Sequence, residues 1–269
     1  MSPVAPTPPG RAPWNSRALV LAAAWCALAQ LASCRGHPEV PILGYHAVVD
    51  DPSRQDTTPA QLAAQLDALA AKGFHTVSLQ AVFDHQDRAR PLPARPIVLT
   101  FDDGTADAFT CVLPLLRARG MTATFFVVSS WLGADAASRR REPASDGEVA
   151  RPELTWPELR ALRDAGMEIG SHSRTHPRLP ELTDEAALEE MVSSKRELES
   201  GLGIPVLLFA YPYNALRART GSLLQEAGYR AAVAGQDHGG RSREALYRIG
   251  VYRETTPEEL VGYALAGAR

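Results

Sequence analysis

Two groups of residues in the sequence have the types and spacing of a hydrolytic metal site. The first is the acid pair Asp102-Asp103, which follows an apolar run and precedes Gly104. The second, about seventy residues later, is the pair His172 and His176. Together they offer one carboxylate and two imidazoles as metal ligands, and a second carboxylate that can handle the proton of a water molecule. This set predicts a catalytic site in which three protein ligands leave one coordination position open.

Each group is weak evidence when taken alone. Paired acids after a strand are common as helix N-caps, and two isolated histidines can be a capping or surface pair, since Pro177 stops any helix just beyond them. A strand break at Gly104 would free both carboxylates from the alternation that turns neighbours to opposite faces. The spacing of His172 and His176 would place both imidazoles on one side of a helical turn. With Asp103 they form a His-His-Asp set that suits zinc.

The elements that must position these residues alternate along the chain. Short apolar runs predict strands at residues 40–45, 76–78, 97–101, 122–128, 168–171, 206–211, 231–234 and 247–252. Amphipathic stretches between them predict helices at residues 59–72, 106–119, 156–165, 184–202, 216–227 and 257–266. This alternation indicates a parallel α/β sheet or barrel in a single domain.

Several predicted helices end in a glycine where a left-handed cap would fall. These glycines are Gly73, Gly120, Gly166 and Gly228, and each is followed at once by a new apolar run. The helix-to-strand turns are therefore short, and the longer strand-to-helix loops can build a site at the carboxyl ends of the strands. One further segment, residues 133–152, lacks periodicity and is predicted to be a solvated polar loop, with the edge of a substrate groove as the alternative.

The start of the chain differs from the rest and predicts an export signal. Arg11 and Arg17 precede an apolar run at residues 18–29 that is too short to span a bilayer comfortably. Leu31-Ala32-Ser33-Cys34 then resembles the lipobox of bacterial lipoproteins, in which the cysteine is acylated and becomes the mature N-terminus. A plain secretory signal or an uncleaved anchor, with Cys34 incidental, is the alternative. We expect a signal peptide at 1–33, a linker at 34–39 and one domain at 40–269.

The composition is that of an ordinary globular protein, because 45% of the residues are hydrophobic and 22% are charged. The formal net charge is −3 and no basic patch occurs, which argues against a nucleic-acid partner. Of the three cysteines, the expected cleavage removes Cys26 and acylation occupies Cys34, so that Cys111 has no thiol to pair with. The fold must therefore be stabilised by its hydrophobic core.

Three motifs in order give the sequence a family resemblance. They are Thr100-Phe101-Asp102-Asp103-Gly104, Ser171-His172-Ser173-Arg174-Thr175-His176 and Phe209-Ala210-Tyr211-Pro212-Tyr213. These stretches resemble the first three motifs of the polysaccharide deacetylases with the NodB homology domain, carbohydrate esterase family 4. The resemblance spans the chain from about residue 40 to the C-terminus. It implies a distorted (β/α) barrel, in agreement with the alternation of predicted elements.

The resemblance also implies a role for each residue of the motifs. Asp103, His172 and His176 are expected to bind the metal ion, Zn²⁺ or another divalent transition metal. Asp102 is expected to be the general base, and the backbone N–H of Tyr213 to hold the oxyanion of the reaction. Such a preorganised donor contributes on the order of 3 kcal/mol to transition-state stabilisation.

The general acid departs from the common family pattern. Many members carry it in a late Leu-x-His, but the final predicted strand has no histidine. The early Gly44-Tyr45-His46 instead resembles the branch that acts on poly-β-1,6-N-acetylglucosamine, in which the motifs appear circularly permuted and an N-terminal histidine is the acid. We predict His46 as the general acid, with His238 as the runner-up. A structural histidine held by core hydrogen bonds is the alternative for His46.

A second departure concerns the residue that orients the base. Ala210 stands where many family members have an arginine, so another residue must hold Asp102, and Arg248 is a candidate. The Tyr-Pro-Tyr of the third motif is also typical of the exopolysaccharide branch. The loss of the arginine therefore indicates a subfamily rather than an inactive protein.

These observations predict an exported, lipid-anchored, zinc-dependent N-deacetylase of an N-acetylglucosamine-containing polysaccharide, at the periplasmic or cell-surface side of a membrane. The favoured substrate is poly-β-1,6-N-acetylglucosamine, an exopolysaccharide of biofilms. Peptidoglycan, chitooligosaccharides and O-acetylated glycans are the alternative substrates. A glycan-binding lipoprotein with weak catalysis is a further hypothesis, which the presence of a base beside the metal ligands argues against.

Overall fold

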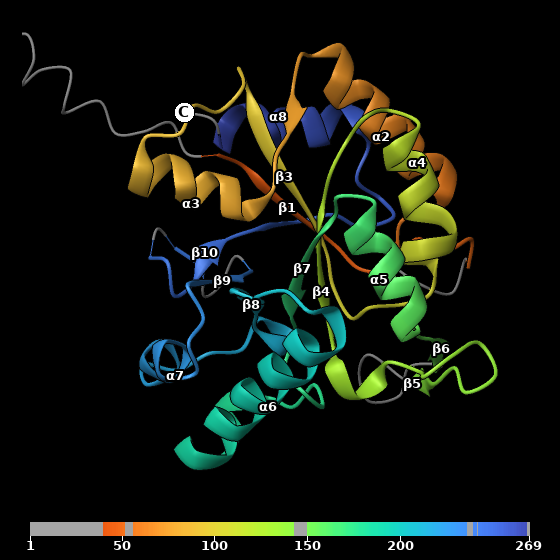
Figure 1. Ribbon diagram of the computed structural model, residues 1–269. Helices are drawn as coiled ribbons and strands as arrows, with labels where there is room; N and C mark the ends of the chain where they lie inside the picture. The colour runs from red at the N-terminus through yellow and green to blue at the C-terminus, as the bar shows by residue number, and fades with distance from the viewer. Residues whose placement is uncertain (1–39, 52–55, 143–149, 236–238, 241, 268–269) are drawn as a thin grey trace, which may run out of the picture. The chain divides into compact units, whose positions relative to one another are not determined.

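The short apolar runs of the chain pair side by side into a parallel, nearly closed barrel in the computed structural model (Figure 1). The structure describes residues 40–51, 56–142, 150–235, 239–240 and 242–267. The barrel strands follow the order β10-β9-β8-β7-β4-β3-β1-β11. They span Ile42–Tyr45 (β1), Pro96–Phe101 (β3), Thr124–Val127 (β4), Glu168–Ser171 (β7), Leu208–Ala210 (β8), Ala231–Ala234 (β9), Leu246–Tyr247 (β10) and Ile249–Gly250 (β11), while β2 (His75–Thr76) pairs with the start of β3. The expected signal segment, Cys34 and His238 lie outside the described residues.

One extended segment closes the barrel. β10 pairs with β9 and β11 pairs with β1, and only Arg248 separates β10 from β11. Arg248 N–H donates to the Ala234 carbonyl oxygen at 2.9 Å, and Val251 N–H donates to the Gly44 carbonyl oxygen at 2.8 Å. The predicted final strand therefore joins the two edges of the sheet, and the barrel fold expected from the sequence is confirmed.

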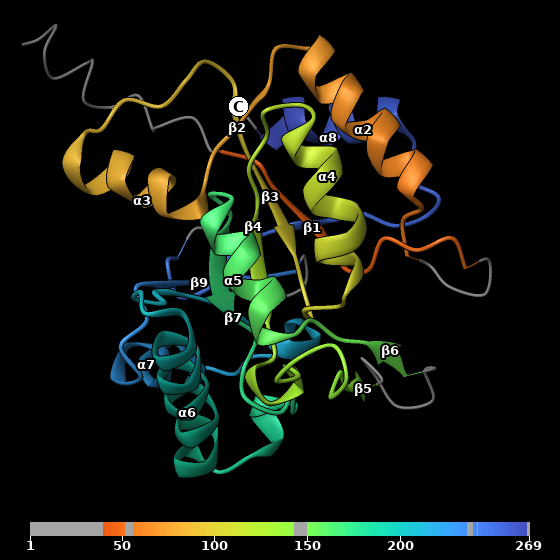
Figure 2. The same cartoon turned by 45° about the vertical axis from the view of Figure 1, so that its right-hand side comes forward.

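Helices surround the barrel, as Figures 1 and 2 show. The α-helices are α2 (Pro59–Ala71), α3 (Leu79–Arg88), α4 (Leu113–Arg117), α5 (Trp156–Asp164), α6 (Asp184–Leu202), α7 (Thr220–Glu226) and α8 (Pro257–Gly267). A π-helical turn, η1 (Ala108–Val112), leads into α4, and single 3₁₀ turns occur at η2 (Ser129–Trp131), η3 (Leu179–Glu181) and η4 (Pro212–Asn214). None of the helices in the described part of the chain combines the length and apolar character needed to cross a membrane.

The core divides into two clusters because side chains alternate along each strand. The outward cluster packs the strands against the helices, with Leu43, Leu99 and Phe125 among its members. The inward cluster fills the barrel with alternate residues such as Val98 and Phe126. The interior is narrow: a Cβ at Gly170 would lie 2.5 Å from the Phe126 ring. Hydrophobic side chains therefore fill the interior of the barrel.

Helix α3 was not expected from the sequence. Its buried apolar residues, Leu79, Val82 and Phe83, join the inward cluster of the barrel. The buried carboxylate of Glu168, which begins β7, accepts hydrogen bonds from the N–H groups of Leu79 (2.8 Å) and Gln80 (3.0 Å) and so caps the helix. The Glu168 contact comes from a residue far away in the sequence, but the helix also has a local cap, since Ser78 Oγ accepts the Ala81 N–H at 3.1 Å.

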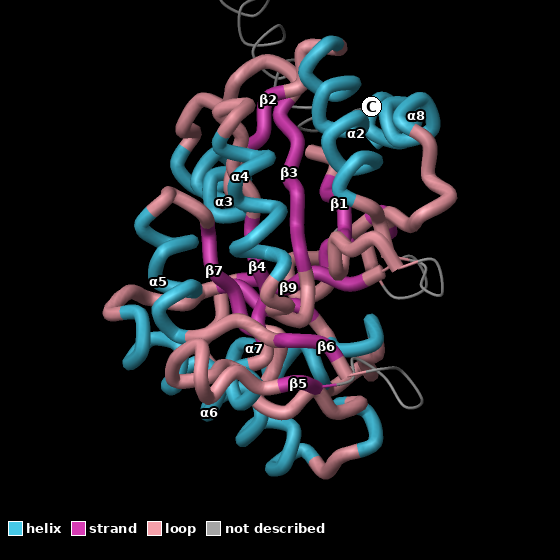
Figure 3. The backbone as a smooth tube through the Cα atoms, turned by 90° about the vertical axis from the view of Figure 1, so that its right-hand side faces the viewer, coloured by secondary structure: helices cyan, strands magenta, loops and turns pink. Residues whose placement is uncertain are grey.

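Other element predictions were mostly right and were corrected at their edges. The four predicted glycine caps all have left-handed backbone, with φ between 63° and 83°. The predicted helix at 216–227 begins only at Thr220, and the one at 106–119 is divided between η1 and α4. The predicted polar loop at 133–152 contains an antiparallel hairpin, β5 (Arg141–Glu142) with β6 (Arg151–Pro152). Figure 3 shows this hairpin separate from the barrel strands β1, β3, β4 and β7.

Candidate metal centre and active site

The acid pair leaves β3 with both carboxylates at the carboxyl end of the barrel. Asp102 N–H still donates to the Tyr45 carbonyl oxygen of β1 at 3.0 Å. Asp103 then adopts a left-handed backbone with φ 70°, followed by Gly104 with φ 92°. Strand alternation is therefore broken at Asp103 itself, one residue before the predicted break at Gly104. Both side chains are buried, and both reach the same site.

Asp103, His172 and His176 bring three possible metal-ligand atoms together. The two Nε2 atoms lie 3.3 Å apart, and Asp103 Oδ1 lies 3.6 Å from His172 Nε2 and 3.7 Å from His176 Nε2. Ligand atoms around a tetrahedral zinc ion, at about 2.0–2.1 Å from the metal, are roughly 3.3–3.4 Å apart. The three atoms therefore match the spacing of a metal site and leave a side open for water or substrate.

The histidines converge through a strained loop and not through a helical turn, which corrects the prediction for their spacing. In this histidine loop, residues 172–176, Ser173 and His176 have left-handed backbone with φ 66° and 63°. Ser173 Oγ accepts the His176 N–H at 2.9 Å, and the Ser173 carbonyl oxygen accepts the Ser129 N–H at 3.3 Å. Left-handed non-glycine residues persist only where the surroundings hold them. The loop is held by bonds to the neighbouring η2 turn.

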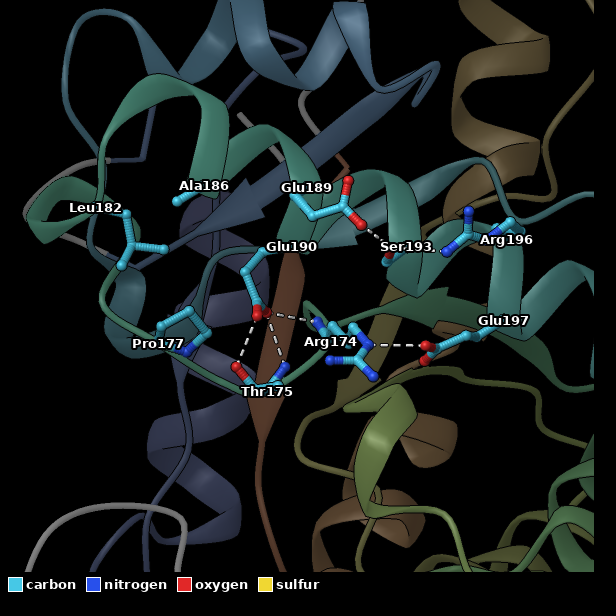
Figure 4. A pocket seen from close by; sticks show the side chains of 10 residues that line it. All are labelled: Arg174, Thr175, Pro177, Leu182, Ala186, Glu189, Glu190, Ser193, Arg196 and Glu197. Carbon is cyan, nitrogen blue, oxygen red and sulfur yellow. Dashed lines mark hydrogen bonds and ion pairs between the residues drawn. The ribbon is translucent and has the colours of Figure 1, made fainter.

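Helix α6 holds the same loop from the outside. The Glu190 carboxylate accepts the N–H groups of Arg174 (3.0 Å) and Thr175 (2.8 Å) and the Thr175 hydroxyl (2.7 Å). Glu197 binds Arg174 Nε at 2.8 Å. Figure 4 shows these contacts at the edge of a polar pocket. Both N–H groups belong to residues between the two histidines, so Glu190 fixes the part of the chain that sets their separation. The sequence did not distinguish Glu190 from its neighbour Glu189.

The two imidazoles have different surroundings. His172 Nδ1 lies 2.8 Å from the Ala210 carbonyl oxygen. A proton on Nδ1 makes this hydrogen bond and leaves the Nε2 lone pair toward the site, as a metal ligand requires. His176 packs between the rings of Trp131 and Tyr213, with centroid distances of 5.2 and 4.6 Å. Its buried Nδ1 has no hydrogen-bond partner among the described residues. The rings around His176 therefore hold it by packing.

The guanidinium of Arg248, which the sequence offered as a candidate to orient the base, contacts the Asp102 carboxylate. Nη1 donates to Asp102 Oδ1 at 2.7 Å and Nη2 donates to Oδ2 at 2.5 Å, while Nη1 also donates to Thr100 Oγ1 at 3.1 Å. The guanidinium is buried, and a bidentate contact of this kind fixes the plane of a carboxylate. Arg248 reaches this place because it occupies the break between β10 and β11.

Arg151 is a residue of the site that the sequence analysis missed. It lies on β6 of the hairpin, and its buried guanidinium donates from Nη2 to Asp103 Oδ2 at 3.1 Å. Nη1 lies 3.5 Å from Asp56 Oδ2. Asp103 thus presents Oδ1 to the histidines and Oδ2 to an arginine. The predicted solvated loop is in part a wall of the site, and no local motif around Arg151 indicated this.

The electrostatic surroundings keep the acids ionised and His176 neutral. For Asp102, burial favours the neutral form, but Arg248, His172 and His46 together lower its pKa well below the usual value. The pKa of Asp103 is also lowered, because its histidine neighbours and Arg151 outweigh the effect of burial. Burial and the nearby His172 lower the pKa of His176 to about 3, against the influence of the acids. These are the protonation states that metal ligands need.

The predicted general acid is brought to the same site. His46 follows β1, is half-buried, and lines a groove together with Tyr213 and Arg248. Its influence on the pKa of both acids places it within electrostatic reach of them. Tyr213 lies beside His176 and has left-handed backbone with φ 57°. Its role as an oxyanion donor stays a prediction, as does the role of His46.

Sequence comparison identifies the family. The family model for polysaccharide deacetylases matches residues 89–232. The chain belongs to the polysaccharide deacetylase family. The matched stretch of this polysaccharide deacetylase holds the acid pair and both histidines, whereas His46 and Arg248 lie outside it. The family match therefore covers the metal-ligand side of the site and not the proposed proton donor.

Two relatives illustrate the range of the family. The Bacillus subtilis (strain 168) protein YxkH, whose name places it among the polysaccharide deacetylases, is 24% identical over 217 residues, which are 79% of this chain and 71% of YxkH. The poly-beta-1,6-N-acetyl-D-glucosamine N-deacetylase of Escherichia coli (strain K12) is 29% identical over 136 residues, which are 49% of this chain and 20% of the E. coli protein. The polysaccharide deacetylase described here thus aligns with about one fifth of that relative.

Solved structures share the fold. The Streptococcus pyogenes deacetylase PplD, solved in complex with acetate, superposes with a TM-score of 0.73 at 22% identity, over 84% of this chain and 98% of PplD. IcaB from Ammonifex degensii superposes with a TM-score of 0.69 at 21% identity, over 86% of this chain and 98% of IcaB. At these identities the likeness establishes the barrel fold, and the chemistry must be argued from the site.

Proposed function

We propose that the protein is a metal-dependent hydrolase that removes N-acetyl groups from an N-acetylglucosamine-containing polysaccharide. The observation that carries the proposal is the division of the acid pair. Asp103 faces two imidazole nitrogens at 3.6 and 3.7 Å, whereas Asp102 is held in a bidentate contact by Arg248. Three ligands and a separate, oriented carboxylate are the parts that metal-assisted hydrolysis requires.

Asp103, His172 and His176 would hold the metal ion, and their donor set favours Zn²⁺ or another divalent transition metal. When bound, the metal supplies Lewis-acid activation of a water molecule and of the acetamide carbonyl. The surrounding residues give both histidines the protonation state that binding of this ion requires. Burial keeps His176 neutral, and the Ala210 carbonyl oxygen sets the tautomer of His172.

Asp102 would be the general base that takes the proton of the attacking water. Its carboxylate is ionised, and Arg248 fixes the direction of both oxygens. The same contact lowers the basicity of Asp102. Correct placement, rather than a high pKa, is therefore what Asp102 contributes to proton transfer.

His46 would be the general acid. As the water oxygen bonds to the carbonyl carbon, the C–N bond breaks only if the nitrogen receives a proton, because an amine anion is a poor leaving group. His46 in protonated form can give that proton, and the products are acetate and a free amino sugar. Its position after β1, in a groove shared with Arg248, supports this role. The Tyr213 N–H is proposed as the donor to the developing oxyanion.

Poly-β-1,6-N-acetylglucosamine is the favoured substrate. This choice is supported by the early Gly44-Tyr45-His46, by Ala210-Tyr211-Pro212-Tyr213, and by the activity for which the E. coli relative is named. Peptidoglycan, chitooligosaccharides and O-acetylated glycans contain bonds that the same set of residues could hydrolyse. The shape of the groove decides among them.

The proposal is tested by measuring acetate released from these four substrates by the full chain after chelation and after addition of Zn²⁺. We expect zinc-dependent release, highest with poly-β-1,6-N-acetylglucosamine. Release from peptidoglycan fragments alone would reassign the substrate. No zinc-dependent release from any of the four would contradict the enzymatic function and favour a glycan-binding protein.

We also propose that the protein is exported and held at a membrane through an acylated Cys34. The order of basic residues, apolar run and Leu31-Ala32-Ser33-Cys34 supports this. Metabolic labelling with an alkyne fatty acid should mark the unsubstituted protein and leave Cys34→Ala unlabelled. Equal labelling of both proteins, or of neither, would contradict an anchor at Cys34.

A further inference from the structure

A groove of about 1100 Å³ leads away from the candidate active site. At one end it is lined by His46, Tyr213 and Arg248. The groove follows the segment that closes the barrel and reaches the last turn of α8. Gly267 in that turn lies close to Pro41, since a Cβ added at Gly267 would be 3.2 Å from the Pro41 side chain. Since Pro41 directly precedes β1 and His46 directly follows it, the groove extends along the length of that strand. A molecule that reacts at the site can therefore continue into this groove.

Three exposed tyrosines line the groove: Tyr247 (39% exposed), Tyr252 (45%) and Tyr263 (42%). Among the described residues only two other large hydrophobic side chains, Ile204 and Leu265, are comparably exposed, and neither lines the groove. A cluster of exposed rings in one hollow is typical of a binding surface, whereas single exposed hydrophobic residues are common everywhere.

The backbone of the groove is shaped to hold one of these rings. A Cβ at Gly250 would lie 2.8 Å from Tyr252 Oη and 2.9 Å from Cε2 of the same ring. The Tyr252 ring thus lies close over the glycine backbone of β11, and any larger residue at position 250 would displace it. Tyr247 and Tyr252 come from the closing segment and Tyr263 from α8, so the rings lie on two separate elements.

The chemistry of the lining fits a neutral or partly cationic carbohydrate chain. A tyrosine ring offers an apolar face for the C–H face of a pyranose and a hydroxyl that can bond to sugar hydroxyls. The remaining charged residues on the groove beyond the site are the acids Glu254 and Glu259. Carboxylates there disfavour a polyanionic glycan and attract free amino groups, which ring faces also attract. An amino-sugar polymer that is being deacetylated carries such groups.

We propose that this groove binds the sugar units next to the reacting N-acetylglucosamine, with Tyr247, Tyr252 and Tyr263 stacking on their pyranose rings. The proposal rests on the proposed deacetylase function. It adds a binding site through which the protein distinguishes long glycan chains from short ones. Such a site favours polymeric substrates, because a short substrate occupies only the catalytic end of the groove and does not contact the tyrosines.

The test compares kcat/KM for acetate release from a hexamer and a dimer of β-1,6-linked N-acetylglucosamine. For Tyr252→Ala and Tyr263→Ala, we expect the hexamer-to-dimer ratio of kcat/KM to fall by about two- to tenfold each, chiefly through KM for the hexamer. Tyr252→Phe should retain most of the ratio, because it keeps the ring. Leu265→Ala is the matched control: Leu265 lies on the same helix as Tyr263 and is equally exposed at 42%, but does not line the groove.

A ratio that stays the same in both alanine variants would overturn the proposal, as would an equal loss for Leu265→Ala. No acetate from either oligosaccharide with the unsubstituted protein would contradict the deacetylase function instead. In that case the affinity for the hexamer, measured by calorimetry, still tests whether the groove binds the glycan. Weaker binding by Tyr252→Ala and Tyr263→Ala would support it, and unchanged binding would overturn it.

Discussion

The candidate metal site and the groove beside it are built in opposite ways. Asp103 and His172 are each only 2% exposed and have fixed hydrogen-bond partners, whereas the tyrosines of the groove are 39–45% exposed. The ligands must keep their atoms within a few tenths of an ångström for a metal ion. The groove must only offer flat surfaces to a flexible polymer. Fixed side-chain positions are therefore found at the ends of β3 and β7, and adaptable ones on the closing segment and α8.

The largest effect is expected at the border between the two regions, where His46 lies. His46→Ala should reduce kcat by roughly 10²–10⁴-fold, because the leaving nitrogen loses its proton donor. The metal content of the purified variant should equal that of the unsubstituted protein. His238→Ala serves as the comparison and should change kcat little. If His238→Ala had the large effect and His46→Ala the small one, the acid role would move to His238.

A smaller effect is expected for the residue that orients the base. Arg248→Lys keeps a positive charge near Asp102 but loses the bidentate contact, so kcat should fall on the order of 10²-fold with little change in KM or metal content. Arg230→Lys is the matched control, because Arg230 contacts Asp84 at 2.9 Å outside the site. A change in KM alone would show that Arg248 acts on binding and not on the base.

The smallest effect is expected for the clamp on the histidine loop. Glu190→Gln replaces an acceptor oxygen by an NH₂ group opposite the N–H groups of Arg174 and Thr175, so the loop loses part of its support. The metal affinity, measured by competition with a chelator, should weaken roughly tenfold. Glu189→Gln is the control on the same helix, since Glu189 bonds to Ser193 and not to the loop. Equal affinity in both variants would exclude a role for Glu190 in holding the ligands.

Much of this arrangement could be predicted from sequence because it is local. The alternation of strands and helices gave the barrel, and the glycine caps at Gly73 and Gly166 gave short turns that place the loops at one end. Residues next to one another in the motifs, such as Asp102 and Asp103, were found because their types and spacing are chemically unusual. Arg248 was one candidate for orienting Asp102, because Ala210 stands where many family members have an arginine.

The rest depends on contacts between residues that are far apart in the chain. Arg151 reaches Asp103 across 48 positions. Glu168 caps α3 across 89 positions. Neither residue belongs to a local sequence pattern, and the contact of each can be recognised only in the folded structure. The histidine loop was misjudged for a different reason. A spacing of four suits a helical turn, but the left-handed residues Ser173 and His176 reach the same convergence without one.

The two adjacent acids are proposed to have unequal roles, with Asp103 as metal ligand and Asp102 as base. The most direct measurement determines zinc per chain and acetate release for Asp102→Asn and Asp103→Asn side by side. We predict that Asp102→Asn retains about one zinc ion per chain but releases almost no acetate, and that Asp103→Asn loses both. Full acetate release by Asp102→Asn, or normal zinc content in Asp103→Asn, would contradict this division of the acid pair.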